Sequence, residues 1–155
     1  MALNYVDVQY ATVAETTTPM TTIGVQASTH VALRVLEQMN STDGSTSTAT
    51  PAKIEICRNT FATNAPGTNS TSITVANGKR DSARDAPQFI AGNTWTVEPT
   101  TITVIRTYNL PQYNGSYHYI NPLSSPYIVP GNGGWSVRFT ASANVNSSGH
   151  LTVEE

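Results

Sequence analysis

The sequence has few charged residues, no excess of basic over acidic residues and no long hydrophobic run. Only 12% of its 155 residues are charged, about half the usual share, and the formal net charge is −2. Such a chain has little with which to neutralise phosphates or an anionic bilayer, so neither nucleic acid nor a membrane is an expected partner. No apolar run has the length of a membrane span, and residues 1–7 lack the basic and apolar segments of a signal peptide. We therefore expect synthesis in a cytosol without general secretion.

Cysteine and catalytic signatures are also scarce. The single cysteine, Cys57, excludes an intrachain disulfide framework, and its place in the strand-like segment 53–57 predicts a buried, inert thiol. His30, His118 and His150 are far apart and lack metal-ligand spacing, and we expect no supporting carboxylate cluster beside them. No phosphate loop, nucleophile elbow or zinc-protease motif occurs. The expectation is a chain that is not an enzyme, with no catalytic residue, cofactor or metal.

Alternating strand patterns fill most of the sequence. The longest runs from Ile23 to Val35, as one long strand or two consecutive ones. A helix over residues 31–39 is the competing interpretation, and β-branched Val31 and Val35 favour the strand. Further strands are predicted at these segments: 6–10, 53–57, 73–75, 95–97, 101–108, 135–141 and 150–155.

These strands predict an all-β fold, a single-domain β-sandwich that is jelly-roll or immunoglobulin-like. Residues 110–130 are predicted as a long loop with short extended pieces, and residues 130–134 as a tight turn. The predicted core consists of Val31, Leu33, Val35, Ile54, Ile56, Val104, Trp135, Val137, Phe139, Leu151 and Val153.

The first nineteen residues are separated from the rest by the sequence TTTP at 16–19. We interpret residues 1–19 as an N-terminal arm or an edge strand, and residues 20–155 as the β-sandwich domain. If residues 1–19 form an arm, they pair with a neighbouring molecule, and the sandwich folds without them.

Two segments are candidate contact surfaces. Residues 79–85 carry five of the eighteen charges of the chain, through Lys79, Arg80, Asp81, Arg84 and Asp85. They form either a contact loop for a partner or a solvated loop with internal Arg–Asp pairs.

Five of the seven tyrosines lie within residues 108–127, mixed with Asn, Gln and Ser. Rigid rings beside adaptable polar groups are typical of recognition surfaces, so Tyr113, Tyr117 and Tyr119 are candidate contact residues. The alternative is that these rings pack the segment onto the sandwich or onto a neighbouring subunit.

The C-terminal third carries a resemblance to a known class of protein. Residues 127–139 read YIVPGNGGWSVRF, residues 143–146 read ANVN, and the chain stops at LTVEE. A Pro-Gly turn, an aromatic-Ser-Val-Arg strand, an Asn-Val-Asn turn and an acidic final strand form a layout similar to that of tailed-bacteriophage virion proteins. Among these, the chain most resembles the small head decoration, or cement, proteins.

This resemblance implies a mechanical role and no catalytic residue. The protein would sit on the outer surface of the virion head, made in the host cytoplasm, and bridge subunits of the major capsid protein. Such proteins are often homo-oligomers, trimers among them. The alternative function is a receptor- or glycan-binding module of a phage tail or fibre that uses the Tyr-rich segment 108–127.

Overall fold

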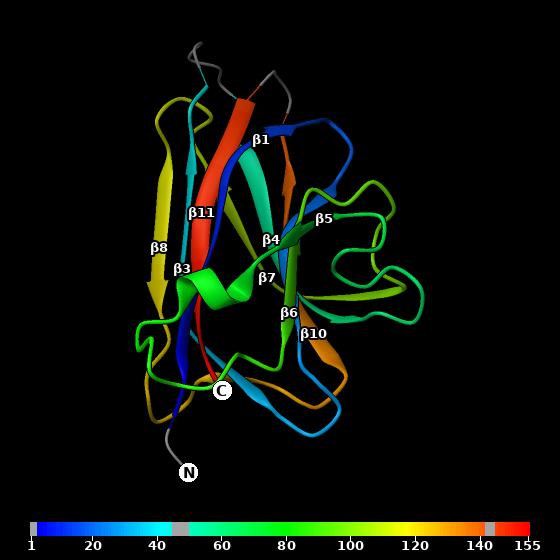
Figure 1. The fold of residues 1–155 in the computed structure, drawn as a ribbon. Helices are drawn as coiled ribbons and strands as arrows, with labels where there is room; N and C mark the ends of the chain where they lie inside the picture. Colours follow the sequence, from blue (N-terminus) through cyan, green and yellow to red (C-terminus); the bar gives the residue numbers. More distant parts are fainter. Residues whose placement is uncertain (1–2, 45–49, 142–144) are drawn as a thin grey trace.

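The computed structural model describes residues 3–44, 50–141 and 145–155, which fold into two antiparallel sheets (Figure 1). Sheet A has the order β1 (Tyr5–Glu15), β11 (Val145–Glu154), β3 (Leu33–Thr42) and β8 (Ser116–Ile120), and β9 (Tyr127–Val129) also pairs with β3. Sheet B has the order β5 (Thr71–Ile73), β6 (Ile90–Asn93), β2 (Met20–Gln26), β10 (Gly133–Thr140), β4 (Ala52–Thr60) and β7 (Thr101–Leu110). A 3₁₀ turn, η1 (Val75–Gly78), precedes the charged loop.

The strand order decides between the two predicted topologies. Strand β1 pairs with β11, β2 with β10, β3 with β8, and β4 with β7. The first strand of the sandwich is thus joined to the last, the second to the next-to-last, and so inward, which is the nested pairing of a jelly roll. The short strands β5, β6 and β9 are additions to this eight-stranded plan. The all-β sandwich prediction is confirmed, and the topology is jelly-roll.

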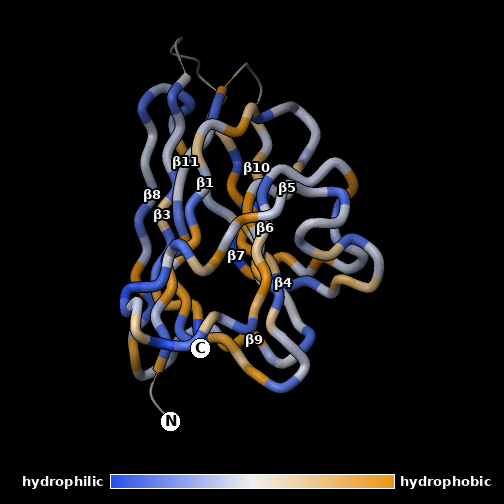
Figure 2. The backbone as a smooth tube through the Cα atoms, viewed as in Figure 1, coloured by the Kyte–Doolittle hydropathy of each residue, from blue (hydrophilic) through white to orange (hydrophobic). Residues whose placement is uncertain are grey.

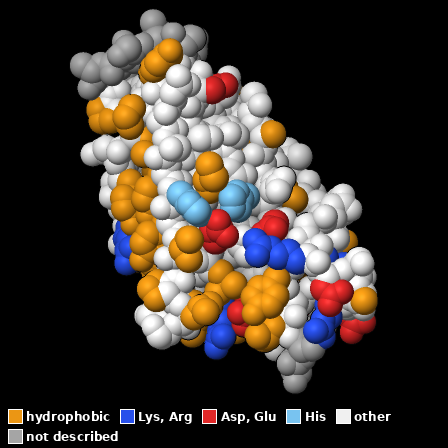
Figure 3. All heavy atoms as spheres, turned by 90° about the vertical axis from the view of Figure 1, so that its left-hand side faces the viewer, with side chains coloured by type: hydrophobic (Ala, Val, Ile, Leu, Met, Phe, Trp, Pro, Cys, Tyr) orange, Lys and Arg blue, Asp and Glu red, His pale blue; other side chains and the backbone are white. Residues whose placement is uncertain are grey.

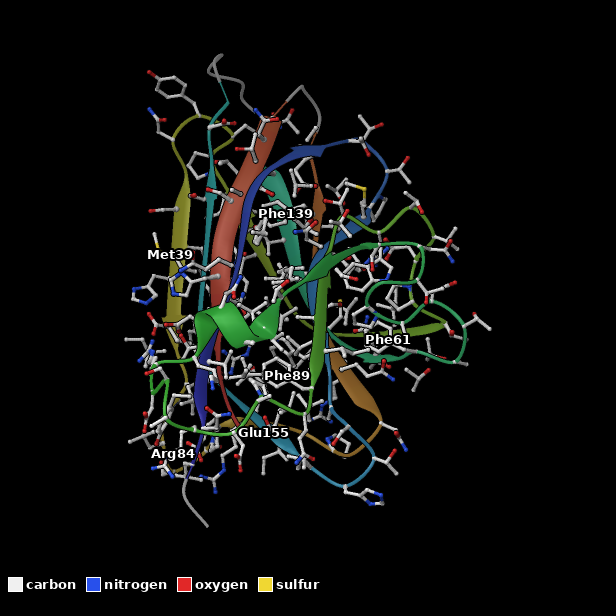
Figure 4. All side chains as sticks on the ribbon, in the orientation of Figure 1. Met39, Phe61, Arg84, Phe89, Phe139 and Glu155 are labelled. Carbon is white, nitrogen blue, oxygen red and sulfur yellow. The ribbon has the colours of Figure 1, made fainter. Side chains whose placement is uncertain are left out.

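The core lies between the sheets, where inward-pointing residues of both meet. Figure 2 shows hydrophobic residues recurring along the strands of both sheets, and Figure 4 shows Phe89 and Phe139 between the sheets. Nine of the eleven predicted core residues are buried, among them Leu33, Ile54 and Trp135. Period-two alternation located these residues correctly because each strand has one side turned towards the other sheet.

Two predicted core residues are not in the core. Val104 is exposed, because a bulge between Ile56 and Cys57 shifts the register of β7 and turns Ile105 towards the interior instead. Val31 is only half-buried, because β2 ends at Gln26 and β3 begins at Leu33, which leaves Val31 in the connection. The alternation from Ile23 to Val35 is therefore two strands, and the helix over residues 31–39 does not form.

The N-terminal residues belong to the sandwich. Strand β1 is the edge strand of sheet A, and its Val6, Val8, Tyr10 and Val13 are buried in the core. Within residues 1–19, Tyr5–Glu15 thus have the position that the edge-strand interpretation gives them. Removal of residues 1–19 would take these four side chains out of the core and uncover the residues that pack on them, so we now expect that the sandwich does not fold without them.

Other local predictions differ in detail. The strand expected at 95–97 is wrong, since β6 ends at Asn93 and Thr94 has a φ of 52°. Val75 lies in η1 instead of a strand. The last strand begins at Val145 instead of residue 150, so Val145 and Asn146 are not in a turn, and residues 143 and 144 lie outside the described residues. The turn at residues 130–134 is confirmed by Asn132, whose φ is 62°.

Candidate interaction surfaces

The outer face of sheet B is covered by the chain itself. The connections at residues 61–70 and 94–100 fold over it (Figure 1). Phe61, labelled in Figure 4, stacks there with Trp95, and their ring centroids lie 6.1 Å apart. Glu98 accepts hydrogen bonds from the Thr21 amide at 2.6 Å and from Arg138 Nε at 3.0 Å. A Cβ atom on the outward-pointing Gly24 would lie 3.0 Å from the Trp95 ring. This face is therefore a second packed layer.

The outer face of sheet A, here called the open face, has no such cover from the described residues. Figure 3 shows this face, with histidine and charged side chains gathered near its centre and hydrophobic side chains around them. Met39 (37% exposed), Ile120 (66%) and Ile128 (54%) are large apolar side chains on it. Across the strands, Gln9, His150, Met39 and His118 form one row of directly opposite neighbours. An uncovered sheet face with exposed apolar side chains is a candidate binding surface.

A charged network crosses the open face. His118 Nε2 lies 2.7 Å from Glu37 Oε1, and His150 Nε2 lies 3.6 Å from the same oxygen. The hydrogen bond from His118 lowers the pKa of Glu37 against the opposing effect of burial, and His150 adds to the lowering. Arg80 reaches the other Glu37 oxygen at 3.9 Å. We expected no supporting carboxylates beside the histidines, so Glu37 was missed: β3 brings it between β8 and β11, which single-sequence spacing does not reveal.

The loop at residues 79–85 is fastened to the edge of β1. Arg80 Nε and Nη2 donate to the two carboxylate oxygens of Asp7 at 2.9 and 2.8 Å, and the Arg80 amide donates to the Tyr5 carbonyl at 3.0 Å. Burial disfavours the ionised form of Asp7, but the Arg80 and Thr152 hydrogen bonds outweigh it and lower the pKa of that carboxyl. Arg80 thus holds the loop against the edge strand, which gives that edge some protection from pairing with other chains.

The other charged residues of the loop are used within it or stay in solvent. Arg84 Nε donates to Asp81 Oδ2 at 3.2 Å, and Lys79 Nζ donates to the Arg84 carbonyl at 2.5 Å. Asp85 is exposed. Arg84 and Asp85 also line a shallow groove beside the chain end at Glu155. The structure therefore shows the internal Arg–Asp pair considered from the sequence, and whether a partner contacts this loop stays a prediction.

Four of the tyrosines and Trp135 form an aromatic row along one edge of the sandwich. The ring centroids of Tyr108 and Tyr117 lie 4.3 Å apart, those of Tyr117 and Tyr119 6.3 Å, and those of Tyr127 and Trp135 4.5 Å. These residues come from β7 and β10 of sheet B and from β8 and β9 of sheet A. The row therefore fills the opening between the sheets, as expected for rings that pack the segment onto the sandwich. Tyr113 is exposed in the β7–β8 connection and takes no part in these ring contacts.

Arg106 completes this row and opens onto a groove. Its Cζ atom lies 5.0 Å from the Tyr119 ring centroid and 5.5 Å from that of Tyr127. The adjoining edge groove has a volume of about 470 Å³. Its walls include Arg58, Arg106, Tyr119, Asn121, Ser125 and Tyr127.

Neither arginine was a candidate from the sequence, although a signal existed. Arg58 is opposite Trp135, and Arg106 is opposite Ile56, so both share the phase of inward-pointing residues. When an arginine occupies an inward-pointing position of a strand, its charged end must still reach solvent, so the position lies where the core meets solvent.

Three further observations concern chemistry. Cys57 is buried, as predicted, and burial raises the pKa of its thiol to about 12. Within residues 3–44, 50–141 and 145–155, no group of three His, Cys, Asp or Glu side chains is placed to hold a metal ion. Over the same residues, no helix is long and apolar enough to cross a membrane.

Comparisons with family models, with curated proteins and with solved structures find no match to this chain.

Proposed function

We propose that this protein is a non-enzymatic structural component of a virus particle, which decorates the assembled shell by bridging subunits of the major capsid protein. The observation that carries the proposal is the contrast between the two outer faces, of which one is covered by the chain and the other is open. The jelly-roll topology supports it, since viral capsid domains use this architecture, as do lectins and cupins. Topology alone does not decide function, so the open face is the stronger support.

The chemistry of the open face suits a protein partner. Apolar Met39, Ile120 and Ile128 are interleaved with charges that pair with one another, as in the ion pairs of Arg80 with Asp7 and of Arg34 with Glu154. A partner that covers such a face gains apolar burial and leaves no unpaired charge behind, which limits the desolvation cost. A decoration subunit that touches two neighbours, or that forms a trimer, gains further through effective concentration. Each single contact can therefore be modest.

The test is the copy number of this protein on purified particles. Particles from cells that produce the protein would be isolated on a density gradient, and the chain would be quantified against the major capsid subunit. Shell decoration requires hundreds of copies per particle, on the outer surface of the head. A handful of copies points to a tail or fibre, and absence from the particles contradicts the proposal.

The aromatic row favours a second candidate function, a receptor- or glycan-binding module of a phage tail or fibre. Tyr119 and Tyr127 line the edge groove, whereas Tyr117 packs between neighbouring rings. Under this proposal Tyr119→Ala lowers attachment to host cells. Tyr113→Ala is the matched control, because Tyr113 is exposed away from these ring contacts. Equal attachment by both variants contradicts this candidate, and the copy number decides between the two functions.

A further inference from the structure

The basic residues of the chain divide into two groups. Six of the eight have a carboxylate or main-chain carbonyl partner. These are Arg34 with Glu154, Lys53 with Glu55, Lys79 with the Arg84 carbonyl, Arg80 with Asp7, Arg84 with Asp81, and Arg138 with Glu55 and Glu98. Arg58 and Arg106 have no carboxylate within 4.0 Å among the described residues, which include every Asp and Glu of the chain. Both line the edge groove.

The edge groove is a positive site on a slightly negative protein. No Asp or Glu belongs to its wall, while the whole chain has a formal net charge of −2. Both arginine side chains are exposed, so a ligand can reach them from solvent. Two guanidinium groups without an acidic partner in one concave site attract an oxyanion, because charge-assisted hydrogen bonds to carboxylate or sulfate are among the stronger ones.

Arg106 is held in place before any ligand arrives. The rings of Tyr119 and Tyr127 lie near its guanidinium, and Arg106 Nη1 lies 3.3 Å from the Tyr108 hydroxyl. A guanidinium carries five N–H donors, so most of them stay free for a ligand after this contact. A side chain that is already oriented loses less conformational entropy on binding, which favours affinity.

The other residues that line the edge groove indicate which kind of molecule would bear the anionic group. Pro122, Pro126 and the tyrosine edges offer apolar surface, and Ser125 offers a hydroxyl for hydrogen bonding. The volume of about 470 Å³ lies in the range of small-molecule sites. A polyanion such as nucleic acid requires a longer track of basic residues than two arginines. A single sugar ring with one negative group suits this groove. Its anion can bind the two arginines, and its ring can contact the apolar surface and the hydroxyl of the walls.

We propose that the edge groove binds an acidic saccharide unit, whose carboxylate or sulfate is held by Arg58 and Arg106. This rests on the second candidate function and names its ligand class. The same oxyanion chemistry could come from a uronic or sialic acid or from a sulfated sugar, and separate titrations distinguish these sources.

The test is a titration of the intact ¹⁵N-labelled protein followed by amide chemical shifts. The probes are glucuronic acid, N-acetylneuraminic acid and glucose 6-sulfate, with neutral glucose, an acidic peptide and inorganic phosphate as comparisons. We expect at least one acidic sugar to shift amides near residues 119–128 and to bind at least tenfold more tightly than glucose. Arg106→Gln and Arg58→Gln should each weaken that binding about tenfold or more, a loss of about 1.4 kcal/mol. Arg84→Gln, which removes an exposed arginine paired with Asp81, should leave it unchanged.

Each other outcome contradicts the inference. If glucose binds as tightly as the acidic sugar, the negative charge has no role. If inorganic phosphate binds as tightly as the acidic sugar, the sugar ring has no role. If the acidic peptide binds more tightly than the acidic sugar, the ligand is a peptide and not a saccharide. An equal loss in Arg84→Gln shows a nonspecific charge effect, and a lack of shifts with every sugar shows that the groove is not a sugar site. The unperturbed spectrum of each variant reports whether it is folded. If acidic sugars fail while Tyr119→Ala still lowers cell attachment, the glycan-binding candidate survives with a neutral ligand.

Discussion

The two outer faces of this sandwich differ in whether other segments of the chain pack on them. On sheet B, Gly24 and Ser136 are directly opposite each other, and the Trp95 ring lies close over Gly24. On sheet A, His150, Met39 and His118 occupy neighbouring outward positions of three strands. At Gly24 the absence of a side chain lets the Trp95 ring pack directly on sheet B, whereas no described segment packs in this way on the outer face of sheet A. One face of this jelly roll therefore contributes to the stability of the fold, and under the proposed function the other face is the one that meets a partner.

The largest expected effect tests the covering of sheet B. Trp95 is 1% exposed, and its indole N–H donates to the Asn64 carbonyl at 3.0 Å. Trp95→Ala should lower the free energy of unfolding by about 3–5 kcal/mol, because it leaves a cavity and an unpaired carbonyl. Met39→Ala, on the open face, should change it by less than about 0.5 kcal/mol. Urea denaturation measures both, and similar losses at the two positions would mean that the open face is also a packed layer.

A medium effect is expected at Glu15, where the two sheets meet. Glu15 is buried, its Oε1 accepts hydrogen bonds from Thr22 at 3.0 Å and from Ser147, and burial raises its pKa to about 7. Because the folded pKa lies above the ordinary value of 4.5, this group's contribution to stability is fully present below about pH 4.5 and is lost as the pH rises through about 7.

Glu15→Gln removes this titration and keeps the shape of the side chain. Relative to the wild type, the variant should gain about 1–3 kcal/mol in free energy of unfolding between pH 4.5 and pH 8. Thermal unfolding across that range measures the difference. A difference that does not change with pH would show that Glu15 is ionised throughout, and that the interior of the sandwich is wetter than its burial indicates.

A smaller effect is expected where the charged loop meets the open face. Arg80→Gln removes the paired hydrogen bonds to Asp7 and should lower the free energy of unfolding by about 1 kcal/mol, because the side chain is half exposed. Amides of residues 79–85 should then exchange with deuterium faster than in the wild type. Arg84→Gln is the control, since its pair with Asp81 lies within the loop. Equal protection in both variants would mean that Arg80 does not hold the loop.

Much of the fold could be predicted from the sequence, because burial on one side of a strand leaves a period-two pattern. Leu33 and Val35, or Val137 and Phe139, show it plainly and are buried. The bulge at Ile56 and Cys57 could not be predicted, since it depends on how β4 pairs with β7. The strand predicted at residues 95–97 does not form, because Trp95 packs on the outer face of sheet B and not in the core between the sheets.

The candidate surfaces were harder to predict than the core. Glu37, His118 and His150 meet only because β3 lies between β8 and β11, which no local pattern encodes. Tyr119 was a candidate from composition alone, whereas its neighbour Arg106 was missed. Composition indicates that a recognition surface exists, and only the three-dimensional pairing shows which residues share it.

The most direct test of the account compares two matched pairs of surface substitutions in binding to purified particles. Met39→Lys with Ile120→Lys places two charges on the open face, away from the walls of the edge groove. Ile90→Lys with Val97→Lys places two charges on the sheet B side, at residues 47% and 51% exposed. Both double variants should unfold at the wild-type temperature. The account predicts that the open-face variant binds with at least tenfold fewer copies per particle and that the other binds like the wild type. Wild-type binding by the open-face variant, or loss of binding by the sheet B variant alone, would contradict it.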